Sequence, residues 1–199
     1  MVNLGFLASG NGSSARAIVA AARSGALAAE PRLLVSNRRQ SPALEFAASA
    51  GLAAICIPTQ ADAEAADRQL AGAMAAHGVQ LIILSGYLRQ LGPVTLQRFA
   101  GRILNIHPGP LPEFGGHGMY GRRVHEAVIA AGAAESGICI HLVDEEYDRG
   151  PVLARRAVPV EPGDTAETLE ARVTALEPAF YVETLGRLIA GKLSLTVPA

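Results

Sequence analysis

Two polar side chains near the middle of the sequence have the types and spacing needed for acyl-group chemistry at neutral pH. Asn105 and His107 are separated by one residue, Ile106, near the end of an expected strand. Their side chains therefore point the same way while Ile106 faces the core. Open α/β sheets bind ligands at such strand ends. Asn supplies an uncharged donor for an oxyanion, and His supplies a donor or a proton that titrates near pH 7. A turn that uses both residues locally is the alternative interpretation.

An acidic stretch, Asp144 to Pro151, supplies a carboxylate that could act on this histidine. Asp148 precedes Arg149 and Gly150, and the glycine allows the backbone to turn the carboxylate toward a cleft. An Asp beside a His orients the imidazole or favours its protonated form. We therefore expect Asp148 to act with His107, and the other acidic side chains of the stretch to be solvated.

A glycine-rich turn, Ser9 to Ser14 (SGNGSS), follows the first expected strand and precedes the first expected helix. Glycines allow a sharp turn and close approach of the backbone to a ligand, and a helix start offers free N–H groups to a phosphate. Ser13 and Ser14 add hydroxyl donors. The turn has neither the Walker A pattern nor GxGxxG, so it predicts a monophosphate site or a plain turn capped by Ser13 rather than a dinucleotide site.

Composition and the remaining motifs disfavour several other functions. The net charge is -1, and the aromatic residues are only five Phe and four Tyr, which disfavours binding to nucleic acid or an anionic membrane. The histidines and cysteines lack metal-ligand spacing, and no GxSxG elbow is present, so we expect neither a metal nor an acyl-enzyme. We expect His141 at the edge of the core, and His117 and His125 flanking a glycine-rich loop. No signal peptide or membrane span is visible, so we expect a cytoplasmic protein.

The elements that must position these residues are apolar runs alternating with Ala-rich helical stretches, which predict a single α/β domain with a doubly wound, mostly parallel sheet. The expected strands are Val2–Ala8, Leu33–Ser36, Ala54–Ile57, Val79–Leu84, Arg102–Ile106, Gly137–Val143 and Val152–Pro159. The expected helices are Ser13–Arg23, Pro42–Ala50, Asp62–His77, Pro93–Phe99, Arg122–Ala131 and Thr165–Ala190, the last with a kink or break at Pro178. Residues 108–121, rich in Gly and Pro, are expected to form a long functional loop.

Together these segments resemble the folate-dependent formyltransferase family from Val2 to about Leu188. The motifs that carry the resemblance are ASGNGSS, ILSGYLRQL, RILNIHPGPLP, ESGICIHLVDEEYDRGPVL and ARVTALEPAFY. The most specific feature is Asn-x-His-Pro followed by Asp-x-Gly-Pro. The resemblance implies a Rossmann-like formyltransferase domain over 1–199, with a nucleotide- and phosphate-binding half (1–100) and a catalytic and folate-binding half (101–199).

The resemblance also implies a role for each matching position. Asn105, His107 and Asp148 match the catalytic trio, and Glu177 matches a glutamate that faces the nucleotide ribose. The positions that match the phosphate loop are Gly12, Ser13 and Ser14. The positions that match the two walls of the folate pocket are Leu88, Arg89, Gln90 and Leu91, and Val143, Asp144 and Tyr147.

The implied reaction is transfer of the formyl group of 10-formyltetrahydrofolate, a co-substrate, to the amine of glycinamide ribonucleotide in purine biosynthesis, without a metal. Asn105 and a protonated His107 would stabilise the tetrahedral oxyanion. Asp148 would raise the pKa of His107 and help relay the amine proton. The implied partners are small molecules only, with no nucleic acid and no membrane, and the implied state is a monomer or homodimer.

Four positions depart from the family pattern, namely Ser14, Ala63, Glu113 and Thr174. The segment Phe114 to Gly121 is also slightly longer than in some members. Thr174 and this segment lie on the expected nucleotide side, so the acceptor amine stays open. The alternatives are a formyltransferase acting on another amine, such as an amino sugar nucleotide, and a 10-formyltetrahydrofolate hydrolase. Related hydrolases and methionyl-tRNA formyltransferases carry an additional domain, which we do not expect in 199 residues. A non-catalytic nucleotide-binding module is disfavoured by the intact trio.

Overall fold

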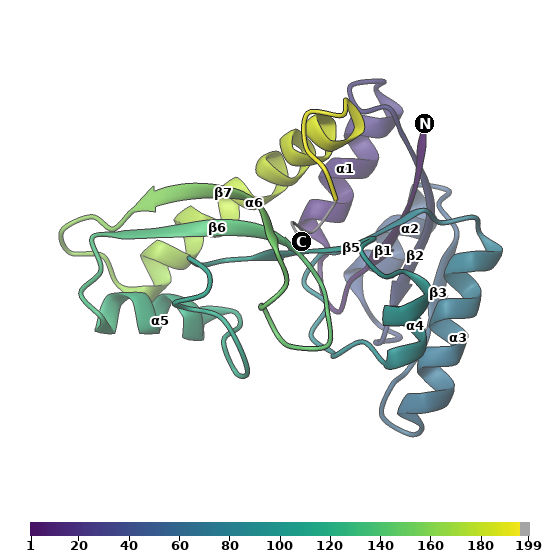
Figure 1. Ribbon diagram of the computed structural model, residues 1–199, viewed down its shortest axis with the longest axis horizontal. Helices are drawn as coiled ribbons and strands as arrows, with labels where there is room; N and C mark the ends of the chain where they lie inside the picture. The colour runs from purple at the N-terminus through teal and green to yellow at the C-terminus, as the bar shows by residue number, and fades with distance from the viewer. Residues whose placement is uncertain (196–199) are drawn as a thin grey trace.

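A seven-stranded sheet runs through the computed structural model, which describes residues 1–195 (Figure 1). Its order is β3-β2-β1-β4-β5-β6-β7. The five strands from β3 to β5 are parallel, whereas β6 is antiparallel to β5 and β7 to β6. This confirms the predicted α/β fold with a mostly parallel sheet. The strands are β1 (Val2–Leu7), β2 (Ala29–Ser36), β3 (Ala54–Cys56), β4 (Leu81–Leu84), β5 (Ile103–His107), β6 (Glu135–Leu142) and β7 (Val152–Pro159).

Helices cover both faces of the sheet, as the doubly wound prediction requires. Buried side chains of α1, α2, α5 and α6 join one hydrophobic cluster, and those of α3 and α4 join the other. Figure 1 shows α1 and α6 on one side of the parallel strands and α3 and α4 on the other. The helices are α1 (Ser13–Arg23), α2 (Pro42–Ser49), α3 (Ala63–Ala76), α4 (Pro93–Arg98), α5 (Arg122–Ala130) and α6 (Ala166–Ile189).

Two elements differ from the sequence prediction by more than one or two residues at an end. β2 begins at Ala29, four residues before the predicted start, although Pro31 cannot donate to the ladder. Its pairing with β1 shifts between Leu4 and Gly5, opposite this proline, which accommodates the missing N–H. α6 continues through Pro178, so the expectation of a break there is wrong. Buried α6 residues on both sides of the proline pack on the same hydrophobic cluster, which outweighs one lost helical hydrogen bond.

The antiparallel pairing of β5 and β6 brings distant polar residues together. Asn105 lies opposite His141, and His107 lies opposite Cys139. Facing residues of neighbouring strands have close Cβ atoms, so the side chain of His141 reaches that of Asn105. The loop after β6 and the loop after β5 then supply the groups that complete the site.

A buried carboxylate on α3 holds the start of α4 and the loop before it. Asp67 is 7% exposed, and its carboxylate accepts hydrogen bonds from the amides of Val94 (2.8 Å) and Thr95 (3.1 Å). The residue that precedes α4, Gly92, has no side chain to cap the helix, and a Cβ there would lie 2.3 Å from the Asp67 carboxylate. Asp67 therefore acts as the helix cap from a neighbouring element.

We expect Asp67→Ala to lower the free energy of unfolding by about 2–3 kcal/mol, because two amides lose their acceptor in a buried place. Denaturant unfolding followed by circular dichroism measures this change. Glu64→Ala is the matched control on the same helix, since its ion pair with Arg68 is exposed and contributes little. Equal unfolding midpoints for the two variants would contradict the capping role.

Candidate functional site

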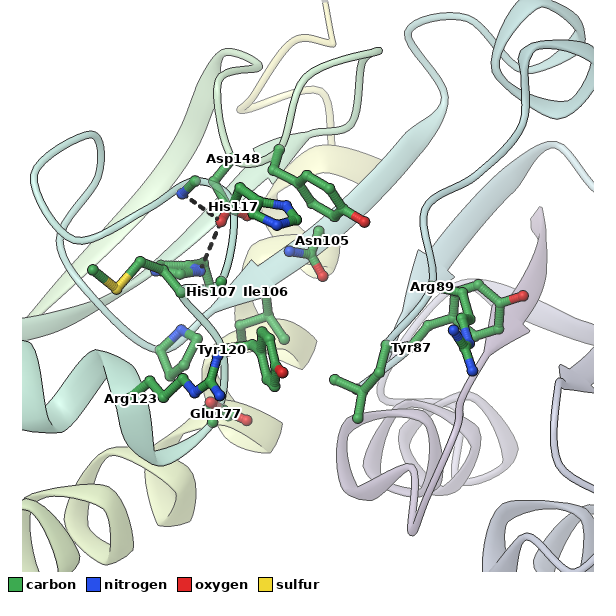
Figure 2. A pocket seen from close by; sticks show the side chains of 18 of the residues that line it. Tyr87, Arg89, Asn105, Ile106, His107, His117, Tyr120, Arg123, Asp148 and Glu177 are labelled. Atoms are coloured by element: carbon green, nitrogen blue, oxygen red, sulfur yellow. Dashed lines mark hydrogen bonds and ion pairs between the residues drawn. The ribbon is translucent and has the colours of Figure 1, made fainter. Parts of the chain in front are cut away.

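A cavity of about 720 Å³ lies at the end of β5, between the loop after β4 and the helices α5 and α6 (Figure 2). A second cavity of about 80 Å³ adjoins it and shares part of its wall. The residues common to both cavities are Tyr87, Arg89, Asn105, Tyr147 and Asp148. Two members of the predicted catalytic trio, Asn105 and Asp148, therefore lie where the two cavities meet, and the third, His107, lines the larger cavity.

The imidazole of His107 is held at both ring nitrogens. The side chain is 2% exposed, its Nε2 lies 2.8 Å from the carbonyl oxygen of Phe114, and its Nδ1 lies 3.5 Å from Oδ2 of Asp148. A carbonyl oxygen can only accept, so Nε2 carries the hydrogen in this arrangement. Nδ1 is then the nitrogen that can take up or release a proton next to Asp148 (Figure 2).

The Asp148 carboxylate is fixed by three neighbours and by its own backbone. Oδ2 accepts from the amide of Gly116 (3.0 Å), and Oδ1 lies 3.4 Å from Nε2 of His141. Asp148 itself has the left-handed conformation (φ 57°), which is uncommon for a residue with a side chain. Gly150 is needed instead for close approach to the Leu142 backbone, because a Cβ there would lie 1.9 Å from the Leu142 carbonyl oxygen. The turn that aims the carboxylate therefore depends on Asp148, not on Gly150 as the sequence suggested.

His141 belongs to this site, although the sequence placed it only at the edge of the core. Its Nδ1 lies 2.8 Å from the Leu142 carbonyl oxygen, and its Nε2 lies 3.1 Å from Nδ2 of Asn105 and 3.4 Å from Oδ1 of Asp148. This contact fixes the amide of Asn105 and leaves its second N–H for a ligand. The alternation of Cys139 and His141 along β6 was the available signal, but it identifies a site residue only once the register with β5 is known.

Burial and neighbouring charges act in opposite directions on the pKa of His107 and on the pKa of Asp148. Burial lowers the pKa of His107 below its ordinary value, although the Asp148 charge and the Phe114 carbonyl raise it. Burial alone would raise the pKa of Asp148, but the His141 hydrogen bond, the charge of His107 and the Gly116 amide together hold it below its usual range. Asp148 therefore raises the pKa of His107 as expected, but desolvation of the imidazole outweighs that attraction in the free protein.

The predicted folate-binding residues surround the trio on one side. Six of them line the smaller cavity, namely Arg89, Gln90, Leu91, Val143, Asp144 and Tyr147, and Leu88 lines the larger one. The Gln90 side chain donates to the carbonyl of Glu145 (3.2 Å) and so ties the two loops together. Of the departures from the family pattern, Ala63 and Glu113 are exposed and line neither cavity, whereas Thr174 lines the larger one.

The opposite end of the larger cavity is formed by one face of α6. Glu170, Thr174 and Glu177 line it at helical spacing. Glu170 already pairs with Nε of Arg122 at 2.7 Å, whereas Glu177 makes no hydrogen bond or ion pair within residues 1–195. Burial raises the pKa of Glu177 to about 7. This unpaired carboxyl group is therefore the one that remains for a ligand.

The predicted phosphate loop lies outside both cavity walls. Gly12 precedes α1 with φ 64°, and a Cβ there would lie 3.2 Å from Cβ of Ala43. The Ser85 hydroxyl accepts from the amide of Ala15 at 3.1 Å, and within residues 1–195 the amides of Ser13 and Ser14 have no recorded acceptor. The loop thus keeps free donors at a helix start, but the structure does not bring Gly12, Ser13 and Ser14 into the same wall as the trio.

Neither a metal cluster nor a membrane span was found in the part of the chain that the structure describes. Within residues 1–195, no three His, Cys, Asp or Glu side chains are grouped as metal ligands. In the same residues, no helix has the length and apolar character needed to cross a membrane.

Known proteins similar to this chain share one family. Residues 2–185 match the family model described as formyl transferase. The chloroplastic phosphoribosylglycinamide formyltransferase of Arabidopsis thaliana is 40% identical, over 93% of this chain and 64% of its own length. The phosphoribosylglycinamide formyltransferase of Escherichia coli is 33% identical, over 98% of this chain and 90% of its own length. The chain thus spans less than two thirds of the plant relative.

A solved structure of the same kind is similar over nearly the whole chain. Glycinamide ribonucleotide transformylase 1 from Symbiobacterium toebii has a TM-score of 0.88 and 34% identity, covering 98% of this chain and 90% of that one. On the match to residues 2–185 and on these identities, the chain belongs to the formyl transferase family.

Proposed function

We propose that this chain transfers the formyl group of 10-formyltetrahydrofolate to the amine of glycinamide ribonucleotide, a step of purine biosynthesis. The observation that carries the proposal is the position of Asn105 and Asp148 where two cavities meet, with the buried His107 beside them in the larger one. A transferase must bring two substrates to one point, and a junction of this kind provides it. The names of the relatives support formyl transfer to glycinamide ribonucleotide.

In this proposal the two substrates approach the trio from opposite sides. The folate enters between Arg89–Leu91 and Val143–Tyr147, and its formyl group lies at Asn105. The ribose of the acceptor lies at Glu177, whose unpaired carboxyl group can accept from hydroxyls, and its phosphate at Gly12, Ser13 and Ser14. Residues 1–100 then bind the phosphate and residues 101–199 supply catalysis and much of the folate pocket; residues 196–199 lie outside the described part.

The proposed chemistry follows from the protonation states. The acceptor amine attacks the formyl carbon, and the second N–H of Asn105 stabilises the oxygen that gains charge. Neutral His107 accepts the amine proton at Nδ1, where Asp148 stabilises the imidazolium that forms (3.5 Å). The C–N bond to the folate then breaks as the imidazolium of His107 returns this proton to the folate nitrogen. The products are the N-formylated acceptor and tetrahydrofolate.

We also propose that the protein acts in the cytoplasm as a monomer or homodimer on small molecules alone. The net charge of -1 supports the absence of a nucleic-acid partner. Sedimentation analysis distinguishes the two assembly states.

The acceptor is tested by following tetrahydrofolate release from 10-formyltetrahydrofolate with glycinamide ribonucleotide, with an amino sugar nucleotide, and with no amine. We expect release only with glycinamide ribonucleotide. Equal release without an amine would indicate a hydrolase, and release only with the sugar nucleotide would identify another acceptor.

We expect His107→Ala and Asp148→Asn to fold normally and to lower kcat on the order of 10²–10³-fold, because each removes a group that acts on the charge developing in the transition state. Steady-state rates with both substrates measure the loss. Glu113→Ala is the control, since this exposed residue lines neither cavity. Near-wild-type turnover of either variant would overturn its assigned role.

Binding of the acceptor should depend on pH through Glu177, whose pKa is raised to about 7 by burial. Above this value the carboxylate is the stronger acceptor for ribose hydroxyls, so KM for the nucleotide should rise several-fold as pH falls from 8 to 6. In Glu177→Gln that dependence should disappear, because its amide does not titrate. An unchanged pH dependence in this variant would assign the titration to another group.

The same residue should make folding less favourable at alkaline pH. The carboxyl group has an ordinary pKa of 4.5 when exposed and about 7 when folded, so the folded state binds more protons between these values and stability falls as pH rises through 7. Glu177→Gln should therefore unfold at a higher temperature than wild type at pH 8, with little difference at pH 5. A gain of equal size at both pH values would contradict this linkage.

A further inference from the structure

A buried histidine on α5 faces the larger cavity without a hydrogen-bond partner. His125 is 1% exposed, lines the cavity, and its Nδ1 is sealed from solvent with no partner. Within residues 1–195, Nε2 also makes no hydrogen bond, yet it is not among the sealed atoms. Nε2 is therefore the ring nitrogen that a molecule in the cavity can reach.

The environment fixes what this nitrogen offers. Burial lowers the pKa of His125 and outweighs the charge of Glu170, while His107 and Arg122 lower it further, so the ring is neutral at pH 7. A neutral imidazole has one N–H, and a buried N–H without an acceptor is less tolerated than an unused lone pair. The hydrogen therefore belongs on Nε2, and His125 presents a donor to the cavity.

His125 lies along the path between the reacting centre and the ribose end. His107 and Glu170 both act on its charge, so it is near each of them. In Figure 2, Asn105, His107 and Asp148 lie above Arg123, Tyr120 and Glu177 on one side of the cavity, and Tyr87 and Arg89 lie across from them. An acceptor whose amine reaches His107 and whose ribose reaches Glu177 must lay its connecting atoms along this wall.

The other polar groups near this wall are less suited to the role. Glu170 is an acceptor and pairs with Arg122, and the exposed Arg123 guanidinium lies over the Tyr120 ring, 5.2 Å from its centroid. In glycinamide ribonucleotide the connecting atoms are an amide, whose carbonyl oxygen requires a donor. His125 is a buried, unsatisfied donor of matching type.

We propose that His125 is a further substrate-binding residue, whose Nε2–H donates to the carbonyl oxygen of the amide between the ribose and the reacting amine of the acceptor. The inference rests on the proposed function and deepens it. An amine without a carbonyl at this position would leave the buried N–H unpaired, so His125 would help to select amide-containing acceptors.

The test compares two variants on two acceptors. His125→Phe keeps much of the ring volume without a donor, and His125→Gln keeps an N–H. The acceptors are glycinamide ribonucleotide and an analogue with a methylene in place of the amide carbonyl. We expect His125→Phe to lower kcat/KM for the amide about 10- to 100-fold through KM, and His125→Gln to retain most of it. On the methylene analogue, wild type and His125→Phe should be alike.

Two controls separate this role from a structural one. Thermal unfolding and the affinity for 10-formyltetrahydrofolate should be the same in wild type and both variants. Equal losses on the two acceptors, or no loss on either, would overturn the inference.

Calorimetric titration with glycinamide ribonucleotide measures binding without turnover and separates the two proposals. Nucleotide binding by wild type without formyl transfer would overturn only the proposed reaction. Binding that His125→Phe leaves unchanged would overturn only the role of His125, and no binding by wild type would overturn both.

Discussion

A buried carboxylate is the constraint on which the site depends. The Asp148 side chain is 10% exposed, and a charge removed from water to this degree must be compensated by donors. The amide of Gly116 donates to it, and the imidazoles of His107 and His141 lie 3.5 and 3.4 Å from its oxygens. These groups come from the loop after β5, from β5 and from β6, so satisfying one charge brings three segments of the chain together.

The same requirement explains how a loop rich in Gly and Pro acquires a defined conformation. The Phe114 carbonyl accepts from His107, and the Gly116 amide donates to Asp148, so two points of the loop are tied to the pair. A Cβ on Gly115, between them, would lie 2.3 Å from a methyl of Leu111 and 3.0 Å from Cβ of Asp148. Glycine is thus needed there for close approach, and the loop order follows from contacts with the catalytic pair rather than from local propensity.

Sequence reasoning found the parts of the site that depend on local pattern. Alternation along β5 predicts that Asn105 and His107 share a face, and apolar runs predict the sheet that carries them. The sequence did not identify His141 and His125 as site residues. Their positions depend on the β5–β6 register and on the packing of α5, which are long-range properties. The sequence did not predict the lowered pKa of His107 for a related reason. Desolvation depends on atoms from many segments, whereas the Asp148 charge is visible in a motif.

The two ends of the cavity differ in how far their polar groups are satisfied. At the trio, Asn105, His107 and Asp148 all have partners, so their geometry is fixed before any ligand binds. At the other end, Glu177 and His125 are largely buried and have none among residues 1–195. Unpaired buried groups discriminate strongly between ligands. A ligand that does not hydrogen-bond to them leaves the cost of their desolvation uncompensated. The chemistry can therefore be common to a family while the acceptor is chosen by a few residues of α5 and α6.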